Sequence, residues 1–364
     1  MLIFEPMSRV RMRFPSKSGI GTAVIAVVVI VIIVVAAAGA YLAFYHGTTS
    51  TTTTTSTSTS TSSTSTTTPI STTPYTLATQ SPAGGESGLS VVLAEQQGFL
   101  AATDPNAKLL PISSPAAIIQ ALVAGSADII DGPTTNFIST YAAGSHNITI
   151  VGSAMPQLEF ALIVSPSSNY TSFNQLQNAS FGVQAPGGAT SILIHLLAKQ
   201  AGWSTLDTVT LQSATATISA VISGQVTATV VDYGTLSTFI GTGLIKVIQN
   251  ITNPLQPNFV IATTTSFLQA HPDAVRAAVA AIGMGGAAFN ANKTFATNFI
   301  ISQVPSIPTI GAQTLASVLK FSTDGSLSLS ALQITVNDMY SLNVIKTNVT
   351  ASDMVTNGYA TINP

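Results

Sequence analysis

Residues 121–135 read ALVAGSADIIDGPTT, and the order of residue types in this stretch decides the fold class. An apolar segment that ends at a glycine is followed by a short β-branched strand, and Asp131 stands at the end of that strand. Residues 220–235, AVISGQVTATVVDYGT, repeat this order and place Asp232 at the end of their own strand. The echo favours two similar α/β units within one chain.

The sequence on either side of these units continues the alternation of strands and helices. Strands are predicted at 75–79, 128–130, 160–164, 180–183, 209–211 and 228–231, and helices at 87–99, 115–123, 190–201 and 214–223. This order is typical of an α/β fold with mostly parallel sheets. Ligands of open α/β sheets bind beyond the carboxyl ends of the strands, so Asp131 and Asp232 are expected beside a cleft between two lobes.

The N-terminal part of the chain predicts a membrane anchor and a stalk. Residues 20–45 carry no charge and are long enough to cross a bilayer as one transmembrane helix. Basic residues precede this helix, so the positive-inside rule places residues 1–19 in the cytoplasm. Residues 46–74 are dominated by Ser and Thr and form a stalk. The folded domain, residues 75–364, is therefore expected on the extracellular side of the cell membrane, with the lipid bilayer as a partner of the anchor.

Three alternatives for the hydrophobic segment stay open. A retained anchor is favoured, because the apolar run is longer than that of a secretory signal. The small residues Ala36, Ala37 and Ala38 offer a place where a signal peptidase can cut. Residues 17–22, KSGIGT, look like the type IV pilin-like leader of archaeal surface proteins, which is cut near Ser18 or Gly19 and leaves the helix in place.

Composition excludes several classes of function. The net charge of -2 and the 7% of charged residues leave no basic footprint for nucleic acid. The chain has no Cys, and its four His are not spaced as metal ligands, so no metal and no cofactor are expected. No G-x-S-x-G elbow is present, and an enzyme is not expected. Asn-x-Ser/Thr sequons, which permit glycosylation, stand at Asn147, Asn169, Asn178, Asn250, Asn292 and Asn348.

Several short motifs between Tyr75 and about Ile300 resemble one family of binding proteins in their order. They are PAGGES at 82–87, AEQQGF at 94–99, A-L-x-x-G-x-x-D at 121–128, FNQL at 173–176, GVQAPGGATS at 182–191 and HPDAV at 271–275. The chain looks like the substrate-binding proteins of nitrate/sulfonate/taurine-type and thiamine-pyrimidine-type ABC importers. It departs from their pattern at Thr227, where Asp is common, and after Pro305, where the match is poor.

The resemblance implies a two-lobed, type II periplasmic-binding fold. Lobe 1 would comprise about 75–155 and 260–364, and lobe 2 about 156–259. The tail is assigned to lobe 1 by default. Closure of the lobes is expected about crossing strands near 153–160 and 259–262.

The expected ligand contacts lie in loops that follow the strands of both lobes. Free N–H groups at the start of a helix can bind an electronegative group of the ligand. The residues expected there are Gly187, Gly188, Ala189, Thr190 and Ser191 in lobe 2, and Ser81, Gly85, Glu86, Ser87, Thr134 and Thr135 in lobe 1. Tyr233 and Phe137 are expected to supply an aromatic wall.

The charges expected near the cleft are all negative. Glu86, Asp131, Glu159 and Asp232 fall in predicted loops there, and no Lys or Arg does. Anionic ligands are often bound with the help of a cation, so this set favours a ligand with amino or hydroxyl donors.

The predicted function is an extracytoplasmic solute-binding protein that captures a small polar molecule between two lobes and delivers it to an ABC-type importer. The implied partner is the permease in the same membrane. The alternative is a structural cell-surface subunit, pilin-like or surface-layer associated, with no transported ligand. A filament subunit would continue its hydrophobic helix directly into the globular head, whereas a Ser/Thr stalk intervenes here.

Overall fold

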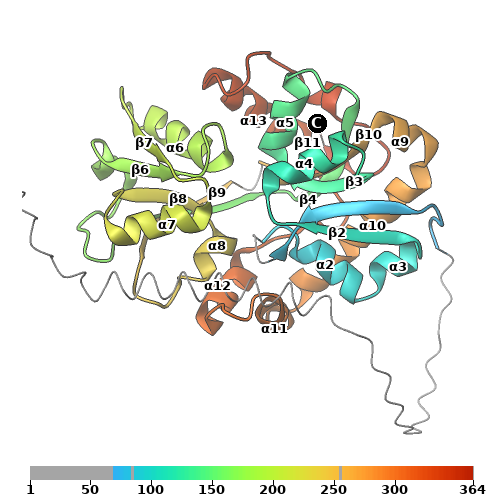
Figure 1. The fold of residues 1–364 in the computed structure, drawn as a ribbon, viewed down its shortest axis with the longest axis horizontal. Helices are drawn as coiled ribbons and strands as arrows, with labels where there is room; N and C mark the ends of the chain where they lie inside the picture. The colour runs from blue at the N-terminus through green and yellow to red at the C-terminus, as the bar shows by residue number, and fades with distance from the viewer. Residues whose placement is uncertain (1–68, 83–85, 254–255, 364) are drawn as a thin grey trace, which may run out of the picture. The chain divides into compact units, whose positions relative to one another are not determined.

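The computed structural model describes residues 69–82, 86–253 and 256–363. The predicted transmembrane helix, almost all of the predicted stalk, and Gly85 lie outside these ranges. The described chain contains two five-stranded sheets with helices above and below each (Figure 1). The predicted α/β class is therefore confirmed for this part of the chain.

The first sheet has the strand order β2-β1-β3-β10-β4. Its strands are β1 (Tyr75–Gln80), β2 (Ala107–Ile112), β3 (Ile129–Pro133), β4 (Ile148–Met155) and β10 (Phe259–Thr264). The helices around it are α2 (Leu89–Gln96), α3 (Phe99–Thr103), α4 (Pro115–Val123), α5 (Thr134–Ala142), α9 (Thr265–Ala270) and α10 (Pro272–Ala291). The strand β1 runs parallel to β2 and β3, whereas β10 runs antiparallel to β3 and β4.

The second sheet has the equivalent order β7-β6-β8-β5-β9. Its strands are β5 (Leu158–Val164), β6 (Ser180–Val183), β7 (Asp207–Thr210), β8 (Ala228–Asp232) and β9 (Lys246–Asn253). Its helices are η2 (Phe173–Leu176), α6 (Ala189–Gln200), α7 (Ala214–Ser223) and α8 (Tyr233–Ser237). The two echoed sequences therefore form α4-β3-α5 in one sheet and α7-β8-α8 in the other, in the same order.

The expectation of mostly parallel sheets is confirmed, because four of the five strands in each sheet run in the same direction and one strand in each sheet runs against them. In the second sheet β5 runs antiparallel to both β8 and β9, as β10 does in the first sheet. The reason is that the chain passes between the sheets twice, once through Pro156 and Gln157 and once between β9 and β10. A strand that arrives from the other sheet enters from the edge at which the parallel strands end, so it runs against them.

The predicted helix at 87–99 is two helices. The helix α2 ends at Gln96, and α3 begins at Phe99. Gly98 lies between them with φ of 76°, in the left-handed region that glycine adopts without a steric cost. The break lets α3 change direction, and α2 and α3 both pack on α10.

The helix α10 is the described helix that is long and apolar enough to cross a membrane. It is nevertheless a core helix, because Ala274, Val275 and Ala278 are fully buried against the first sheet. Its glycines allow close packing on α2: a Cβ on Gly285 would stand 2.1 Å from the carbonyl oxygen of Ser90.

The C-terminal tail contacts elements of both sheets. It consists of α11 (Lys293–Gln303), α12 (Thr309–Val318), β11 (Leu327–Ser328), α13 (Leu329–Ser341), η3 (Ala351–Met354) and β12 (Ile362–Asn363). The helix α12 packs on α8, where Gly311 lies against the carbonyl oxygen of Ser237, and Figure 1 shows the two helices side by side. The helix α13 shares a hydrophobic cluster with Ile192 of α6, while Val355 forms a β-bridge with Ile150 of the first sheet.

Candidate functional site

Most of the predicted site residues lie at or after the carboxyl ends of the parallel strands in the two sheets. After β1, Ser87 is buried and its hydroxyl donates a hydrogen bond to Gln80 Oε1 over 2.6 Å. Ser81 is half-buried, and its backbone N–H donates to the carbonyl of Ile112. These bonds fix both ends of the loop that carries Glu86.

Asp131 lies inside β3 rather than in a loop, which corrects the sequence expectation. Its side chain is fully buried, and Oδ2 accepts a hydrogen bond from Thr79 Oγ1 over 2.9 Å. Burial raises the pKa of Asp131 to about 7, although the bond from Thr79 acts in the opposite direction. At neutral pH this carboxyl can therefore accept or donate a hydrogen bond.

Thr134 and Thr135 begin α5 at the end of β3. The backbone N–H of Thr134 donates to the carbonyl of Asn258, which belongs to the connection from β9 to β10. Its side chain is buried, and that of Thr135 is half-buried. The start of α5 is thus held against one of the two connections between the sheets.

The glycine-rich loop of the second sheet leads from β6 into α6. Gly187 has φ of 75°, Gly188 is the N-cap residue of α6, and the half-buried Ala189 is its first residue. Thr190 and Ser191 follow with buried side chains. The geometry agrees with the predicted strand-loop-helix context of this motif.

At the end of β8, Asp232 is the N-cap residue of α8. Its Oδ1 accepts a hydrogen bond from the backbone N–H of Thr235 over 2.7 Å. Tyr233 follows, and its hydroxyl donates to Asn250 Oδ1 over 2.6 Å.

Phe137 does not form an aromatic wall with Tyr233. It is fully buried in the core of the first sheet, where it stacks on Tyr141 with ring centroids 6.3 Å apart. Helical spacing from Thr134 turns its ring into that core. The predicted aromatic wall is therefore wrong.

Glu159 lies in β5, next to the connection from β4, and not in a loop. Its Oε1 accepts a hydrogen bond from Gln157 Nε2. Burial raises the pKa of Glu159 to about 7, and the bond from Gln157 and the charge of Lys320 lower it. The expectation that no Lys or Arg lies near these acids is therefore wrong.

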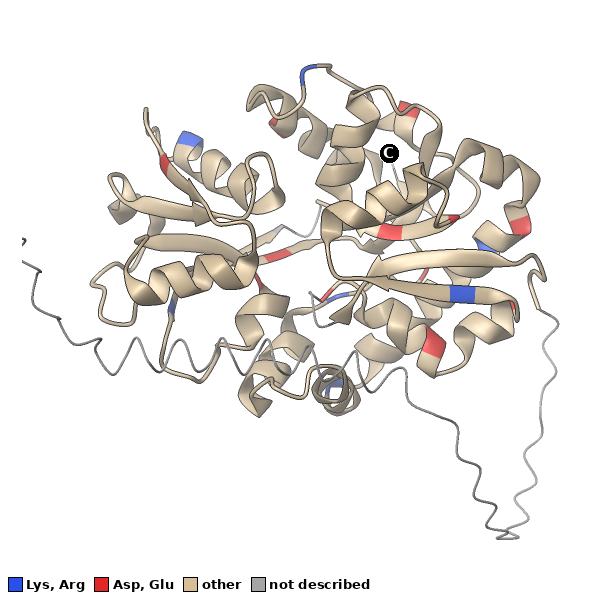
Figure 2. Ribbon diagram, in the orientation of Figure 1, with Lys and Arg blue, Asp and Glu red and all other residues tan. Residues whose placement is uncertain are grey.

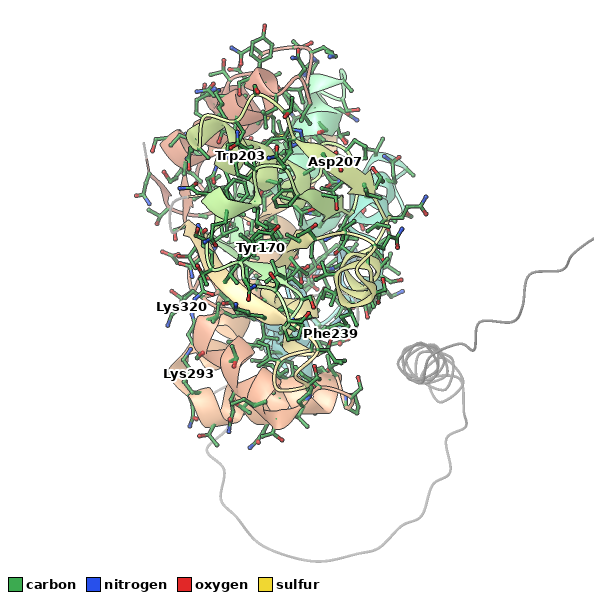
Figure 3. The ribbon with its side chains drawn as sticks, turned by 90° about the vertical axis from the view of Figure 1, so that its left-hand side faces the viewer. Tyr170, Trp203, Asp207, Phe239, Lys293 and Lys320 are labelled. Carbon is green, nitrogen blue, oxygen red and sulfur yellow. The ribbon has the colours of Figure 1, made fainter. Side chains whose placement is uncertain are left out.

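Sequence reasoning missed Lys320 because it follows α12, in the tail where the family pattern gives no guidance. Figure 3 shows Lys320 above Lys293 at one edge of the view. Lys320 also contributes, after burial, to lowering the pKa of Lys293. A cation from the tail thus stands within electrostatic reach of a carboxyl in the second sheet.

Glu86 joins the two sheets. Its buried carboxyl lies against Gly234 at the start of α8 and within electrostatic reach of Asp232. A Cβ on Gly234 would stand only 2.1 Å from Glu86 Oε2. Burial, and after it the charge of Asp232, raise the pKa of Glu86 well above its ordinary value. Figure 2 shows acidic residues gathered where the two sheets approach one another.

A cavity of about 410 Å³ lies between the second sheet and the tail. It is lined by Val183, Pro186, Gly187, Ser191, Ile192, His195, Thr208, Thr210, Leu342, Asn343 and Val344. His195 Nδ1 donates a hydrogen bond to the carbonyl of Ser191 over 2.7 Å. Two of the predicted ligand residues, Gly187 and Ser191, thus line a cavity whose other wall comes from the tail.

Several predicted site residues keep a polar atom without a partner. Among the described residues, buried atoms with no hydrogen-bond partner include Asp131 Oδ1, Thr134 Oγ1, Glu159 Oε2 and Thr190 Oγ1. Such atoms are uncommon in folded proteins, because each costs about 1–3 kcal/mol when it is removed from water. These atoms belong to both lobes, and they comprise carboxyl oxygens and hydroxyl groups. A polar ligand can therefore form hydrogen bonds with them.

Comparison with known proteins supplies a family. A family model described as "NMT1/THI5 like" matches residues 88–293. No curated protein matches the chain.

Solved structures show the same fold at low sequence identity. The alkanesulfonate-binding protein SsuA from Xanthomonas axonopodis pv. citri is 18% identical with a TM-score of 0.68, covering 78% of this chain and 98% of its own. A Candida albicans gene product described as having the generic periplasmic binding protein fold is 19% identical with a TM-score of 0.66, covering 80% and 99%. SsuA from Escherichia coli is 15% identical with a TM-score of 0.66, covering 78% and 92%. The predicted periplasmic-binding fold is therefore confirmed.

Proposed function

The chain belongs to the NMT1/THI5-like family, and on this premise we propose that it is an extracytoplasmic solute-binding protein. It captures a small polar molecule between its two lobes and delivers it to the permease of an ABC-type importer in the same membrane. Proteins of similar structure include an alkanesulfonate-binding protein and a nitrate-binding protein, which supports this class of function. The proposed function is binding and delivery, without chemical conversion of the solute.

The observation that carries the proposal is the pair of hydroxyls at the first turns of α5 and α6. Among the residues that the structure describes, Thr134 Oγ1 and Thr190 Oγ1 are buried without a hydrogen-bond partner. They belong to different sheets and follow the carboxyl ends of β3 and β6. A solute between the lobes would give both hydroxyls a partner, together with the free N–H groups of the two helix starts.

We place the solute among molecules with amino or hydroxyl donors. The carboxyls of Asp131 and Glu159 each keep, within the described part of the chain, one oxygen without a partner. Lys320 lies within electrostatic reach of Glu159, so an anionic group on the same solute would also find a cation. A molecule with both kinds of group satisfies more of these side chains than a simple oxoanion does.

The structural-subunit alternative has less support. It requires neither two sheets with equivalent strand orders nor unpartnered hydroxyls at two helix starts. In the proposed function, residues 20–45 hold the binding domain near its permease, and the Ser/Thr stalk gives it reach.

A ligand screen on the full chain in detergent tests the proposal. Trp203, the single tryptophan, stacks on Phe173 with ring centroids 4.4 Å apart and reports unfolding of the second lobe by fluorescence. Aminopyrimidines, amines, amino acids, sulfonates and oxoanions are added, and at a hundredfold excess over Kd a true ligand stabilises the fold by about 2.7 kcal/mol.

Matched variants separate binding from general stabilisation. Thr134→Ala and Thr190→Ala should weaken the effect of the active compound, whereas Thr205→Ala, at an exposed position, should leave it unchanged. A screen in which no compound raises the unfolding temperature contradicts the proposal.

A further inference from the structure

The cavity of about 410 Å³ beside α6, hereafter the α6 pocket, has walls from three elements. Ser191 and His195 stand one turn apart on α6 and therefore lie on the same face of the helix. Thr208 and Thr210 alternate along β7, the edge strand of the second sheet, so their side chains share one side of it. The third wall is the segment 342–344, which follows α13. The enclosed volume lies within the range of small-molecule pockets, roughly 300–1,000 Å³.

The tail wall is a helix end whose backbone is held by hydrogen bonds. The backbone N–H of Val344 donates to the carbonyl of Met339. That of Asn343 donates to the carbonyl of Tyr340. These two bonds make a Schellman motif, and Asn343 has the left-handed φ of 57° that this motif places after the helix. The end of α13 therefore fixes where the segment 342–344 lies.

Val344 lies against the glycine-rich loop at the start of α6. A Cβ on Gly187 would stand 2.8 Å from Val344 Cγ1, and Gly187 has φ of 75°. Ser191, which lines the pocket, directly follows Thr190, whose buried hydroxyl has no partner among the described residues. Consecutive Cα atoms are about 3.8 Å apart, so the α6 pocket adjoins the proposed solute site.

The lining of the α6 pocket is polar in part but carries no carboxylate, ammonium or guanidinium group. None of the described residues that line it is Asp, Glu, Lys or Arg. Val183, Ile192 and Leu342 supply apolar surface, while Thr208 and Asn343 supply hydrogen-bonding groups. An ionised group that enters gives up hydration and finds no counterion. An uncharged group with both apolar and hydrogen-bonding atoms fits this lining better.

We propose that the α6 pocket is a side pocket of the solute site, which receives an uncharged group of mixed polarity from the solute, such as a short alkyl amide or alcohol. This inference deepens the proposed function and rests on it. Thr134 and Thr190 would hold the polar head of the solute, and the α6 pocket would select among solutes with the same head. The family match ends at residue 293, so the tail wall belongs to a part of the chain that the match does not cover.

Protection of a single thiol tests whether the α6 pocket is occupied. The chain has no Cys, so Thr208→Cys in the full chain in detergent places one thiol in the pocket. Thr205→Cys places one at an exposed position outside the lining. At roughly ten times its Kd, uncharged butanamide should slow the reaction of the thiol at position 208 with a maleimide about tenfold. Butanoate, which has nearly the same shape and a charge, should not slow it, and the thiol at position 205 should react at an unchanged rate with either compound.

A filled pocket provides the matched control. Thr208→Phe should abolish the binding of butanamide seen by ligand-detected NMR, whereas Thr205→Phe should retain it. Unfolding followed by Trp203 fluorescence shows whether both variants are folded. The proposal is overturned if butanamide protects neither thiol or both, if butanoate protects as well as butanamide, or if the folded Thr208→Phe variant still binds butanamide. A ligand screen without a hit would contradict the proposed function and leave the butanamide result intact, so the two proposals fail separately.

Discussion

Asp128 and Thr227 occupy equivalent positions in the two echoed units, and their surroundings explain why the second unit tolerates the loss of the acid. Asp128 Oδ2 accepts a hydrogen bond from the backbone N–H of Thr76 over 2.8 Å, which ties the start of β3 to β1. In the second unit, the backbone N–H of Thr227 donates to the carbonyl and to the hydroxyl of Ser180 on β6. The backbone N–H of Asp128 likewise donates to the carbonyl of Thr76, so a backbone bond ties the strands in both units, and only the side-chain bond has its donor and acceptor on opposite strands.

This difference predicts that substitutions at Asp128 and Ser180 lower the free energy of unfolding by unequal amounts. Asp128→Ala removes the side-chain acceptor of Thr76 N–H and should lower the free energy of unfolding by about 1–3 kcal/mol. Ser180→Ala leaves the carbonyl acceptor of Thr227 in place and should cost less than about 1 kcal/mol. Denaturant unfolding of the full chain, followed by Trp203 fluorescence, measures both. Equal losses would show that the side-chain bond does not hold β3.

Single residues also mark the limit of what the sequence predicts about the site. Glu86, Thr134 and Thr190 were predicted from motif order, and each has a buried side chain at the end of a parallel strand. The contact of Glu86 with Gly234 was not predictable, because it depends on how the two lobes meet. Lys320 could not be placed either, since no periodicity links a residue after α12 to a carboxyl in β5.

At the scale of elements, the helices and strands of the echoed units were predictable because each has a clear pattern. The structure has α7 at the predicted 214–223 and β6 at 180–183. Of β4, only the end that overlaps the expected crossing segment near 153–160 was predicted, and the strands β2 and β9 were missed. Both lie at the edge of a sheet, and β2 alternates half-buried and exposed residues around Pro111 without a strong apolar run.

The packing of α12 on α8 gives a prediction at this scale. A Cβ on Gly311 would stand 1.9 Å from the carbonyl oxygen of Ser237, so Gly311→Ala must push the two helices apart. Overpacking of this kind costs about 1–3 kcal/mol. Gln313→Ala, on the exposed side of the same helix, should be nearly neutral. Thermal unfolding of both variants measures the difference, and a neutral Gly311→Ala would mean that α12 moves freely on α8.

At the scale of the whole binding domain, the two connections between the sheets determine which motion is available. The connection from β4 to β5 consists of Pro156 and Gln157, and the other runs from β9 to β10. Rotation about such short paired segments moves the lobes as rigid bodies. The proposed solute would be enclosed by this motion.

Solute binding should therefore change the distance between the lobes. With spin labels at the exposed positions Ser204→Cys and Gln269→Cys, a compound identified by the ligand screen should change the distance distribution between the labels. The Thr190→Ala variant should need more compound for the same shift. If saturation leaves the distance distribution unchanged, binding takes place without closure.

The position of β10 in the first sheet has a consequence for the order of assembly. Strands β5 to β9 are continuous in the chain, so the second sheet is complete once residue 253 has emerged. The first sheet needs β10, residues 259–264, between β3 and β4. During synthesis or export from the N-terminus, the second lobe can thus finish folding while β3 and β4 still wait for the strand that joins them. The lobe that begins the folded chain is the last to be completed.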